Sequence, residues 1–208
     1  MRTKNVLFLA GLVFIFSICS FAQNDISFSL GGLTSSDQTL TPVGITCAIG
    51  ATCGSLSSSI NNGIAFEGAF AHRLFGFHLA SIDVELPVLG APGRNLRFGG
   101  SSSGSPVSFL FFTPSARLRF LNGRAISPFG SIGGGLAHFG FSGGDRNGGA
   151  AQFGGGLDFK SPFPRVAFRA EVRDFYSASS LGTSSGLTQV SPNRANNIFA
   201  GGGVVLRF

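Results

Sequence analysis

Apolar and polar side chains alternate with a period of two in eight segments of the chain. The clearest are 63–72, 79–86, 166–176 and 197–208, and the others are the segment around Ile26, Phe28 and Leu30, then 109–121, 128–141 and 151–160. A period of two is the repeat of a β-strand, and neither heptads nor a 3.6-residue stripe occurs. The pattern predicts eight strands, although it leaves the facing of the glycine-rich segment 128–141 open.

The connections between these strands alternate strictly between long and short. Residues 73–76, 122–125 and 161–165 are short, whereas 34–62, 87–106, 142–149 and 177–194 are long and rich in Ser and Gly. In an up-and-down arrangement every long loop lies at one end, and every short turn lies at the other end with both termini. Transmembrane β-barrels of the outer membrane are built in this way.

The two faces of the strands differ in chemistry. One is dominated by Phe and Leu and carries no charge, while the other is rich in Gly, Ala and Ser and carries every strand charge. A soluble sandwich or lipocalin-like barrel would turn its apolar face inward. The apolar faces, however, are close to the ~10 residues that cross a bilayer, and small residues suit the narrow interior of eight strands. We therefore predict an all-β, eight-stranded antiparallel up-and-down transmembrane β-barrel. Its lumen is predicted to hold a charge network of Glu67, Asp83, Glu85, Arg117, Arg119, Asp158, Lys160, Arg169, Glu171, Arg173 and Arg207.

Residues 1–22 have the features of a cleaved signal peptide. Arg2 and Lys4 precede the apolar run 6–18, and Ser20-Phe21-Ala22 supplies small residues for cleavage. Thirteen apolar residues are too few for a membrane-spanning helix, and Ile18 before Cys19 disfavours a lipoprotein. The barrel domain is then 23–208.

Two cysteines, Cys47 and Cys53, remain in the exported chain. Paired cysteines are usual in an oxidising compartment, so we predict a local disulfide in the first long loop. Two free thiols are the alternative. Two thiols alone make a poor metal site, because structural zinc takes four ligands.

Composition excludes several classes of protein. Charged residues are 12% of the chain, about half the usual share, and hydrophobic residues are 43%, which excludes a disordered chain. Without its leader the chain has 13 bases and 9 acids, a net charge of +4 that is scattered. Nucleic-acid binding needs a clustered basic face and is not predicted.

The chain ends on a strand with a terminal aromatic residue. Phe208 is preceded by Leu206 and Val204 at two and four places, which resembles the C-terminal assembly signal of Gram-negative outer-membrane proteins. The mature chain as a whole resembles the small eight-stranded outer-membrane barrels of the OmpA transmembrane-domain, OmpX and opacity-protein type. Segment 169–176 is also similar to the penultimate strand of outer-membrane β-barrel-domain proteins. Two departures are that Phe replaces the usual girdle residues Trp and Tyr, and that no peptidoglycan-binding domain follows the barrel.

The resemblance implies a location and a set of partners. The protein is expected in the outer membrane of a Gram-negative-type bacterium, as a monomer surrounded by lipid and lipopolysaccharide. Periplasmic chaperones and the barrel-assembly machinery are its expected partners during biogenesis, and an external surface ligand is not named by the sequence.

Candidate catalytic and ligand-binding groups are few. Some barrels of this size are lipid A deacylases or palmitoyltransferases with His- and Ser-based sites. His138 is followed by Phe139 and Gly140 rather than by a serine two places on, and His72 and His78 flank a short turn. Asp145 and Asn147 lack the other ligands of a calcium loop, and the glycine triplets lack the Lys-Ser or Lys-Thr of a phosphate loop. No catalytic residue, cofactor site or metal site is predicted.

The sequence thus predicts a non-enzymatic outer-membrane protein with a structural role or a surface-contact role through its external loops. A narrow gated ion channel through the charged lumen is the main alternative. A lipid A-modifying enzyme is the third.

Overall fold

The computed structural model describes residues 24–42, 56–98, 104–142, 144–178, 188–191 and 194–208. Within these ranges, twelve strands form one antiparallel sheet. They are β1 (Asn24–Ser35), β2 (Gln38–Pro42), β3 (Leu56–Ile60), β4 (Gly63–Gly76), β5 (Ala80–Phe98), β6 (Ser105–Phe112), β7 (Ser115–Phe120), β8 (Ile126–Phe141), β9 (Gly144–Lys160), β10 (Val166–Ala178), β11 (Thr188–Ser191) and β12 (Arg194–Arg207). No helix in these described ranges is long and apolar enough to cross a membrane.

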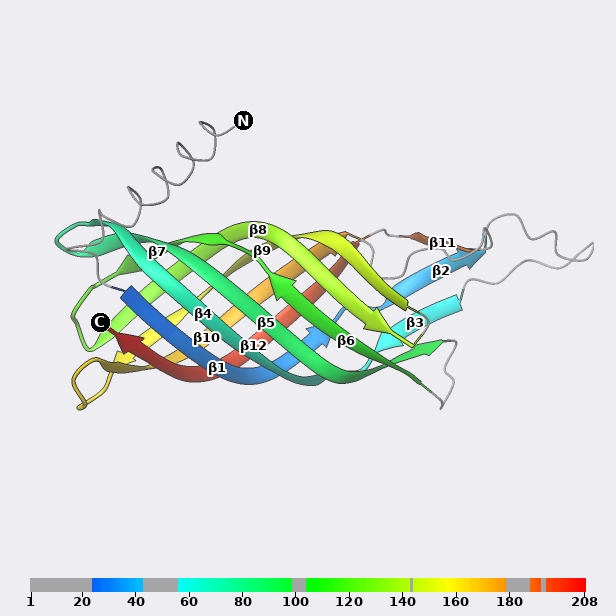
Figure 1. The fold of residues 1–208 in the computed structure, drawn as a ribbon, viewed down its shortest axis with the longest axis horizontal. Coiled ribbons are helices and arrows are strands. Elements are labelled where there is room, and N and C mark those ends of the chain that lie inside the picture. Colours follow the sequence, from blue (N-terminus) through cyan, green and yellow to red (C-terminus); the bar gives the residue numbers. More distant parts are fainter. Residues whose placement is uncertain (1–23, 43–55, 99–103, 143, 179–187, 192–193) are drawn as a thin grey trace, which may run out of the picture.

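The sheet closes on itself as a barrel (Figure 1). Its wall runs β1, β4, β5, β6 with β7, β8, β9, β10 and β12, and the ladder between β1 and β12 closes it from Asp25↔Arg207 to Ser35↔Asn197. Strands β6 and β7 share one position in the wall, because both pair with β5 and β8 on either side of a break at 113–114. The prediction of an eight-stranded antiparallel barrel is confirmed.

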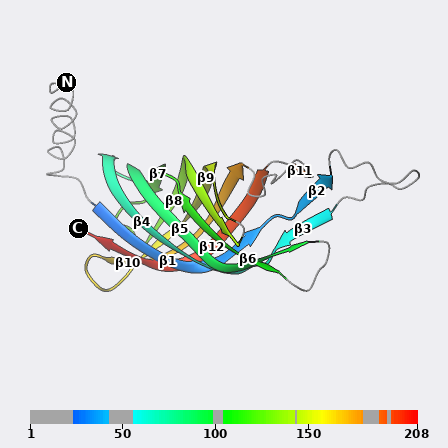
Figure 2. The same cartoon turned by 45° about the vertical axis from the view of Figure 1, so that its right-hand side comes forward.

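The sheet reaches farther at one end than the sequence pattern indicated. Strand β5 continues to Phe98, β8 reaches Phe141 and β9 already begins at Gly144, so the predicted long loops over 87–106 and 142–149 are mostly wrong. Strands β2, β3 and β11 extend the sheet in the order β11-β2-β3-β5 (Figures 1 and 2). Apolar alternation cannot detect such extensions, since ladder hydrogen bonds form equally between strands with polar side chains. These extensions lie at the end of the barrel opposite Asn24 and Phe208. They comprise β2, β3 and β11, the end of β5 up to Phe98, and the ends of β8 and β9 near Phe141 and Gly144. We call them the outer projection.

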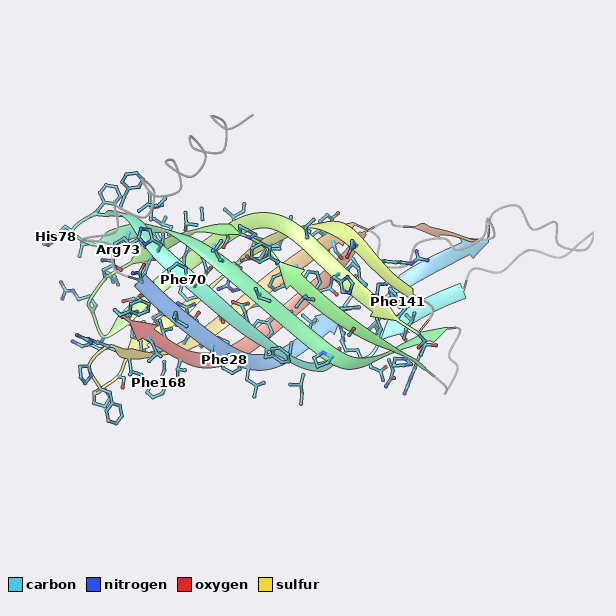
Figure 3. All side chains as sticks on the ribbon, in the orientation of Figure 1. Phe28, Phe70, Arg73, His78, Phe141 and Phe168 are labelled. Atoms are coloured by element: carbon cyan, nitrogen blue, oxygen red, sulfur yellow. The ribbon has the colours of Figure 1, made fainter. Side chains whose placement is uncertain are left out.

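The barrel turns its apolar face outward. Phe28 and Phe168 point away from the wall in Figure 3, with 55% and 50% of their surface exposed. Leu, Ile and Val side chains complete an exposed apolar belt around the wall, whereas most of the charged residues of the same strands, such as Glu85 and Arg173, are buried. The alternation therefore has the sense of a transmembrane barrel.

Close packing of the wall depends on glycine at the closing seam. A Cβ on Gly203 of β12 would collide with the carbonyl oxygen of Phe28 on β1. Gly32 on β1, by contrast, has open space where its Cβ would lie. Gly203 thus permits the close approach of the first and last strands.

Candidate functional site

The lumen nearest the termini is filled by ionisable side chains, which we call the charge layer. Ten of them are at most 4% exposed: Asp25, Glu67, Asp83, Glu85, Asp158, Glu171, Arg117, Arg119, Arg169 and Arg173. Two further arginines, Arg73 and Arg207, reach this group from the rim with 24% and 19% of their side chains exposed. The layer therefore contains equal numbers of acidic and basic side chains, six of each.

Arg173 on β10 joins three carboxylates from three strands. Its guanidinium binds Glu85 through two parallel contacts, Nη1–Oε2 at 3.0 Å and Nη2–Oε1 at 3.1 Å. It also lies 3.1 Å from Glu67 and 2.9 Å from Glu171. A Cβ on Gly154 of β9 would lie 2.9 Å from Cγ of Arg173, so the glycine leaves room for this side chain. Such two-point contacts fix orientation as well as charge.

A second group lies around Arg117 and Arg119 on β7. Arg117 binds Asp83 of β5 at 2.9 Å, Asp25 of β1 at 3.0 Å and Glu85 at 3.1 Å. Arg119 is also paired with Asp25. Asp83 and Glu85 lie on β5, the neighbour of β7, but the contacts with Asp25 cross the lumen, because β1 and β7 are not neighbours in the wall.

A third group lies around Asp158 on β9. Arg169 donates to both of its oxygens, from Nε at 2.8 Å and from Nη2 at 3.2 Å, and Arg207 donates at 3.0 Å. The ring of Phe129 lies beneath the Arg169 guanidinium at 4.4 Å and near that of Arg117 at 5.8 Å. One aromatic ring therefore lies within cation–π distance of two guanidinium groups.

Ten of the eleven residues predicted for the lumen lie in this layer, and one does not. Lys160 is exposed, because β9 ends there at the rim, and the prediction for it is wrong. Asp25 was missed, although the alternation of Ile26, Phe28 and Leu30 already placed it on the polar face. Val204, Leu206 and Phe208 of the predicted assembly signal are 40%, 50% and 58% exposed on the outside of the wall. Cys47 and Cys53 lie outside the described residues.

Farther from the termini the lumen is apolar, which the sequence did not predict. We call this part the phenylalanine layer; it comprises Phe109, Phe111, Phe139, Phe175 and Phe199 with Leu33 and Leu89, all at most 3% exposed. Phe109 and Phe139 meet edge to face at 5.0 Å, and Phe111 lies 5.0 Å from Phe175. These separations are favourable for aromatic pairs.

Arg94 lies beside the phenylalanine layer, toward the outer projection. Its guanidinium lies 5.0 Å from the ring of Phe109 and donates to the backbone oxygen of Asn61 and to Ser35 at 2.9 and 2.7 Å. Among the described residues it has no carboxylate partner. The buried Arg94 guanidinium is therefore met by hydrogen-bond acceptors and an aromatic ring.

The histidines do not form a hydrolytic site with the described residues. Nδ1 of His138 lies 2.7 Å from Asn147 Oδ1, and its Nε2 lies 3.9 Å from Asp145. Both ring nitrogens therefore face these side chains rather than a hydroxyl nucleophile, which a triad requires. His72 contacts Asn24 at 2.8 Å, and His78 lies in the turn after β4 (Figure 3). No group of three metal-binding side chains occurs in the described part of the chain.

Known structures share this fold. OprG, an outer membrane protein of Pseudomonas aeruginosa, is 12% identical with a TM-score of 0.53, and the match covers 89% of this chain and 96% of that one. Neisserial surface protein A is 13% identical with a TM-score of 0.50, over 90% and 99% of the two chains. No protein-family model and no curated protein matches the sequence. At these identities the similarity concerns the fold alone, which is that of a small eight-stranded barrel of the outer-membrane type.

Proposed function

We propose that the protein is a non-enzymatic β-barrel of a Gram-negative-type outer membrane that acts through its outer projection, in surface contact or in membrane structure. The observation that carries this proposal is the filling of the lumen. Glu85 and Arg173 in the charge layer and Phe111 and Phe175 in the phenylalanine layer are all 0% exposed. The charge layer and the phenylalanine layer both fill the lumen and support the wall. The outer projection is then the part of the molecule that can recognise a partner.

The form of the outer projection supports this proposal. Strand β3 pairs with β5 through Ser58↔Phe98 and Ile60↔Leu96, and β2 pairs with both β3 and β11. A laddered sheet holds its surface in a defined shape, whereas an unpaired loop of the same length does not. Such a sheet presents Ser- and Thr-rich strands as a platform above the membrane.

Residence in the outer membrane is tested by gel mobility with and without boiling. A closed barrel has no free edges and resists detergent, so the unboiled protein of the outer-membrane fraction should migrate differently from the boiled one. Recovery in the soluble periplasmic fraction with no mobility shift refutes the proposal.

Surface contact is tested by removing part of the outer projection. A variant with residues 38–60 replaced by a short Gly-Ser turn should keep the mobility shift but reduce adherence of producing cells to polystyrene beads. The matched control replaces the turn 161–165 at the other end with Gly-Ser residues of equal number and should adhere as wild type does. Equal adherence of both variants contradicts a contact role.

A gated ion path is the second candidate, favoured by the charges in the lumen. Replacing Arg117 and Arg169 with Ala should raise planar-bilayer conductance if the charge layer is the gate. If the phenylalanine layer also blocks the lumen, the variant without Arg117 and Arg169 should conduct only when Phe111→Ala and Phe139→Ala are added to it. Openings of the unmodified protein would overturn the closed-barrel proposal, and a changed lipid A profile on overproduction would favour the enzyme instead.

A further inference from the structure

Two short turns enclose a basic pocket at the end of the barrel that carries the termini. The pocket has a volume of about 240 Å³ and lies between residues 123–124 and residues 160–166, beside Arg207. Four cationic side chains line it: Arg124, Lys160, Arg165 and Arg207. Its lining contains no acidic residue, so the pocket is suited to an anion.

Three of these four cationic side chains form no ion pair with the described part of the chain. Arg207 donates to Asp158, but Arg124, Lys160 and Arg165 are exposed and have no ion-pair partner among the described residues. Like charges gathered without a counterion repel one another. A ligand with negative charge would relieve that repulsion.

The turn that carries Arg165 is held in a fixed form. Arg165 has a φ of 66°, in the left-handed region that non-glycine residues enter only under constraint. The turn contains Pro162 and Pro164, the Phe163 amide donates to the Ser161 hydroxyl at 3.1 Å, and Arg207 N–H donates to the Arg165 carbonyl at 2.8 Å. The turn is therefore ordered before any ligand arrives, which lowers the entropy cost of binding.

Apolar side chains lie immediately beside the pocket on the outer surface. Ile126, Phe159 and Phe168 are cross-strand neighbours on β8, β9 and β10, and they are 46%, 37% and 50% exposed. Phe163, at the pocket itself, is 66% exposed. One site therefore offers cations at the membrane edge and an apolar row toward the membrane interior.

We propose that this pocket binds the phosphate of an anionic phospholipid in the periplasmic leaflet, with the acyl chains lying along Ile126, Phe159 and Phe168. The cations select against a zwitterionic headgroup, because its ammonium would face Arg124 and Arg165. A free phosphate would use the cations but not the apolar row. Basic pockets at membrane edges are known to hold lipid headgroups.

The test is native mass spectrometry of the refolded full-length barrel. The detergent-solubilised protein is mixed with equal amounts of phosphatidylglycerol and phosphatidylethanolamine that have identical chains, and the bound lipids are counted. Since one basic residue near a membrane surface contributes about fivefold, wild type should retain phosphatidylglycerol at least about fivefold over phosphatidylethanolamine. Lys160→Gln with Arg165→Gln should bring the ratio close to one.

The matched control neutralises two arginines of the outer projection, Arg97→Gln with Arg146→Gln, and should keep the wild-type ratio. The mobility shift on boiling establishes that each variant is folded, and Arg124→Gln serves as a second pocket variant should the double variant not fold. An equal loss of preference in the control overturns the proposal, as does a wild-type ratio in the pocket variants. Complete displacement of the lipid by inorganic phosphate also overturns it, because the site would then hold a free anion.

Discussion

Replacing Arg173 with Met tests whether the ion pairs of the charge layer stabilise the folded barrel. Arg173 is 0% exposed and contacts Glu67, Glu85 and Glu171 within 3.1 Å. Methionine keeps most of the side-chain volume but leaves three buried carboxylates facing one another. Removing one partner of a buried ion pair costs about 3–5 kcal/mol, so we expect a loss of this size in the free energy of unfolding.

The measurement is urea unfolding of the barrel in phospholipid vesicles, followed by far-UV circular dichroism, because the chain contains no Trp. Arg207→Met is the control: its side chain is 19% exposed at the rim, and we expect a cost of about 1 kcal/mol or less. Adding Glu67→Gln and Glu171→Gln to Arg173→Met should restore part of the lost stability. The reasoning fails if Arg173→Met costs no more than Arg207→Met, or if the added substitutions restore nothing.

Three further outcomes are expected. Phe111→Ala should destabilise the barrel by about 3–5 kcal/mol in the same urea assay because it empties part of the phenylalanine layer, whereas lipid-facing Phe112→Ala should cost less than half as much. Gly203→Ala should reduce the fraction of heat-modifiable barrel on gels through its clash at the closing seam, and Gly32→Ala, which has open space, should not. Iodoacetamide should modify Cys47 and Cys53 only after reduction, as intact-mass measurement would reveal; modification of both without a reductant contradicts the predicted disulfide.

The charge layer was largely readable from the sequence, because each of its residues alternates with an apolar neighbour. Glu171 between Ala170 and Val172 is an example: a charge flanked by apolar residues in a strand has only one face available. Asp25 obeyed the same rule. Lys160 departs from the pattern because β9 ends there at the rim and its side chain is exposed, whereas Arg207, at the end of β12, still reaches Asp158.

The phenylalanine layer could not be predicted from the alternation of apolar and polar residues. Residues 109–112 are four consecutive apolar residues, Phe-Leu-Phe-Phe, so period-two analysis assigns no inward face. Only the pairing of β6 with β5 and β8 turns Phe109 and Phe111 into the lumen while Leu110 and Phe112 face outward. The outer projection was missed for a related reason, since polar strands carry no apolar signal.

The contacts of Asp25 with Arg117 and Arg119 depend on the curvature of the sheet. In a flat sheet β1 and β7 would be three strand spacings apart, about 14 Å, which is too far for an ion pair. Only the rolled sheet brings these groups together, and the pairs are lost as soon as any seam of the wall opens. Opening one seam therefore removes a ladder of hydrogen bonds and the cross-lumen ion pairs in the same step, so the cylinder should unfold as one cooperative unit rather than strand by strand.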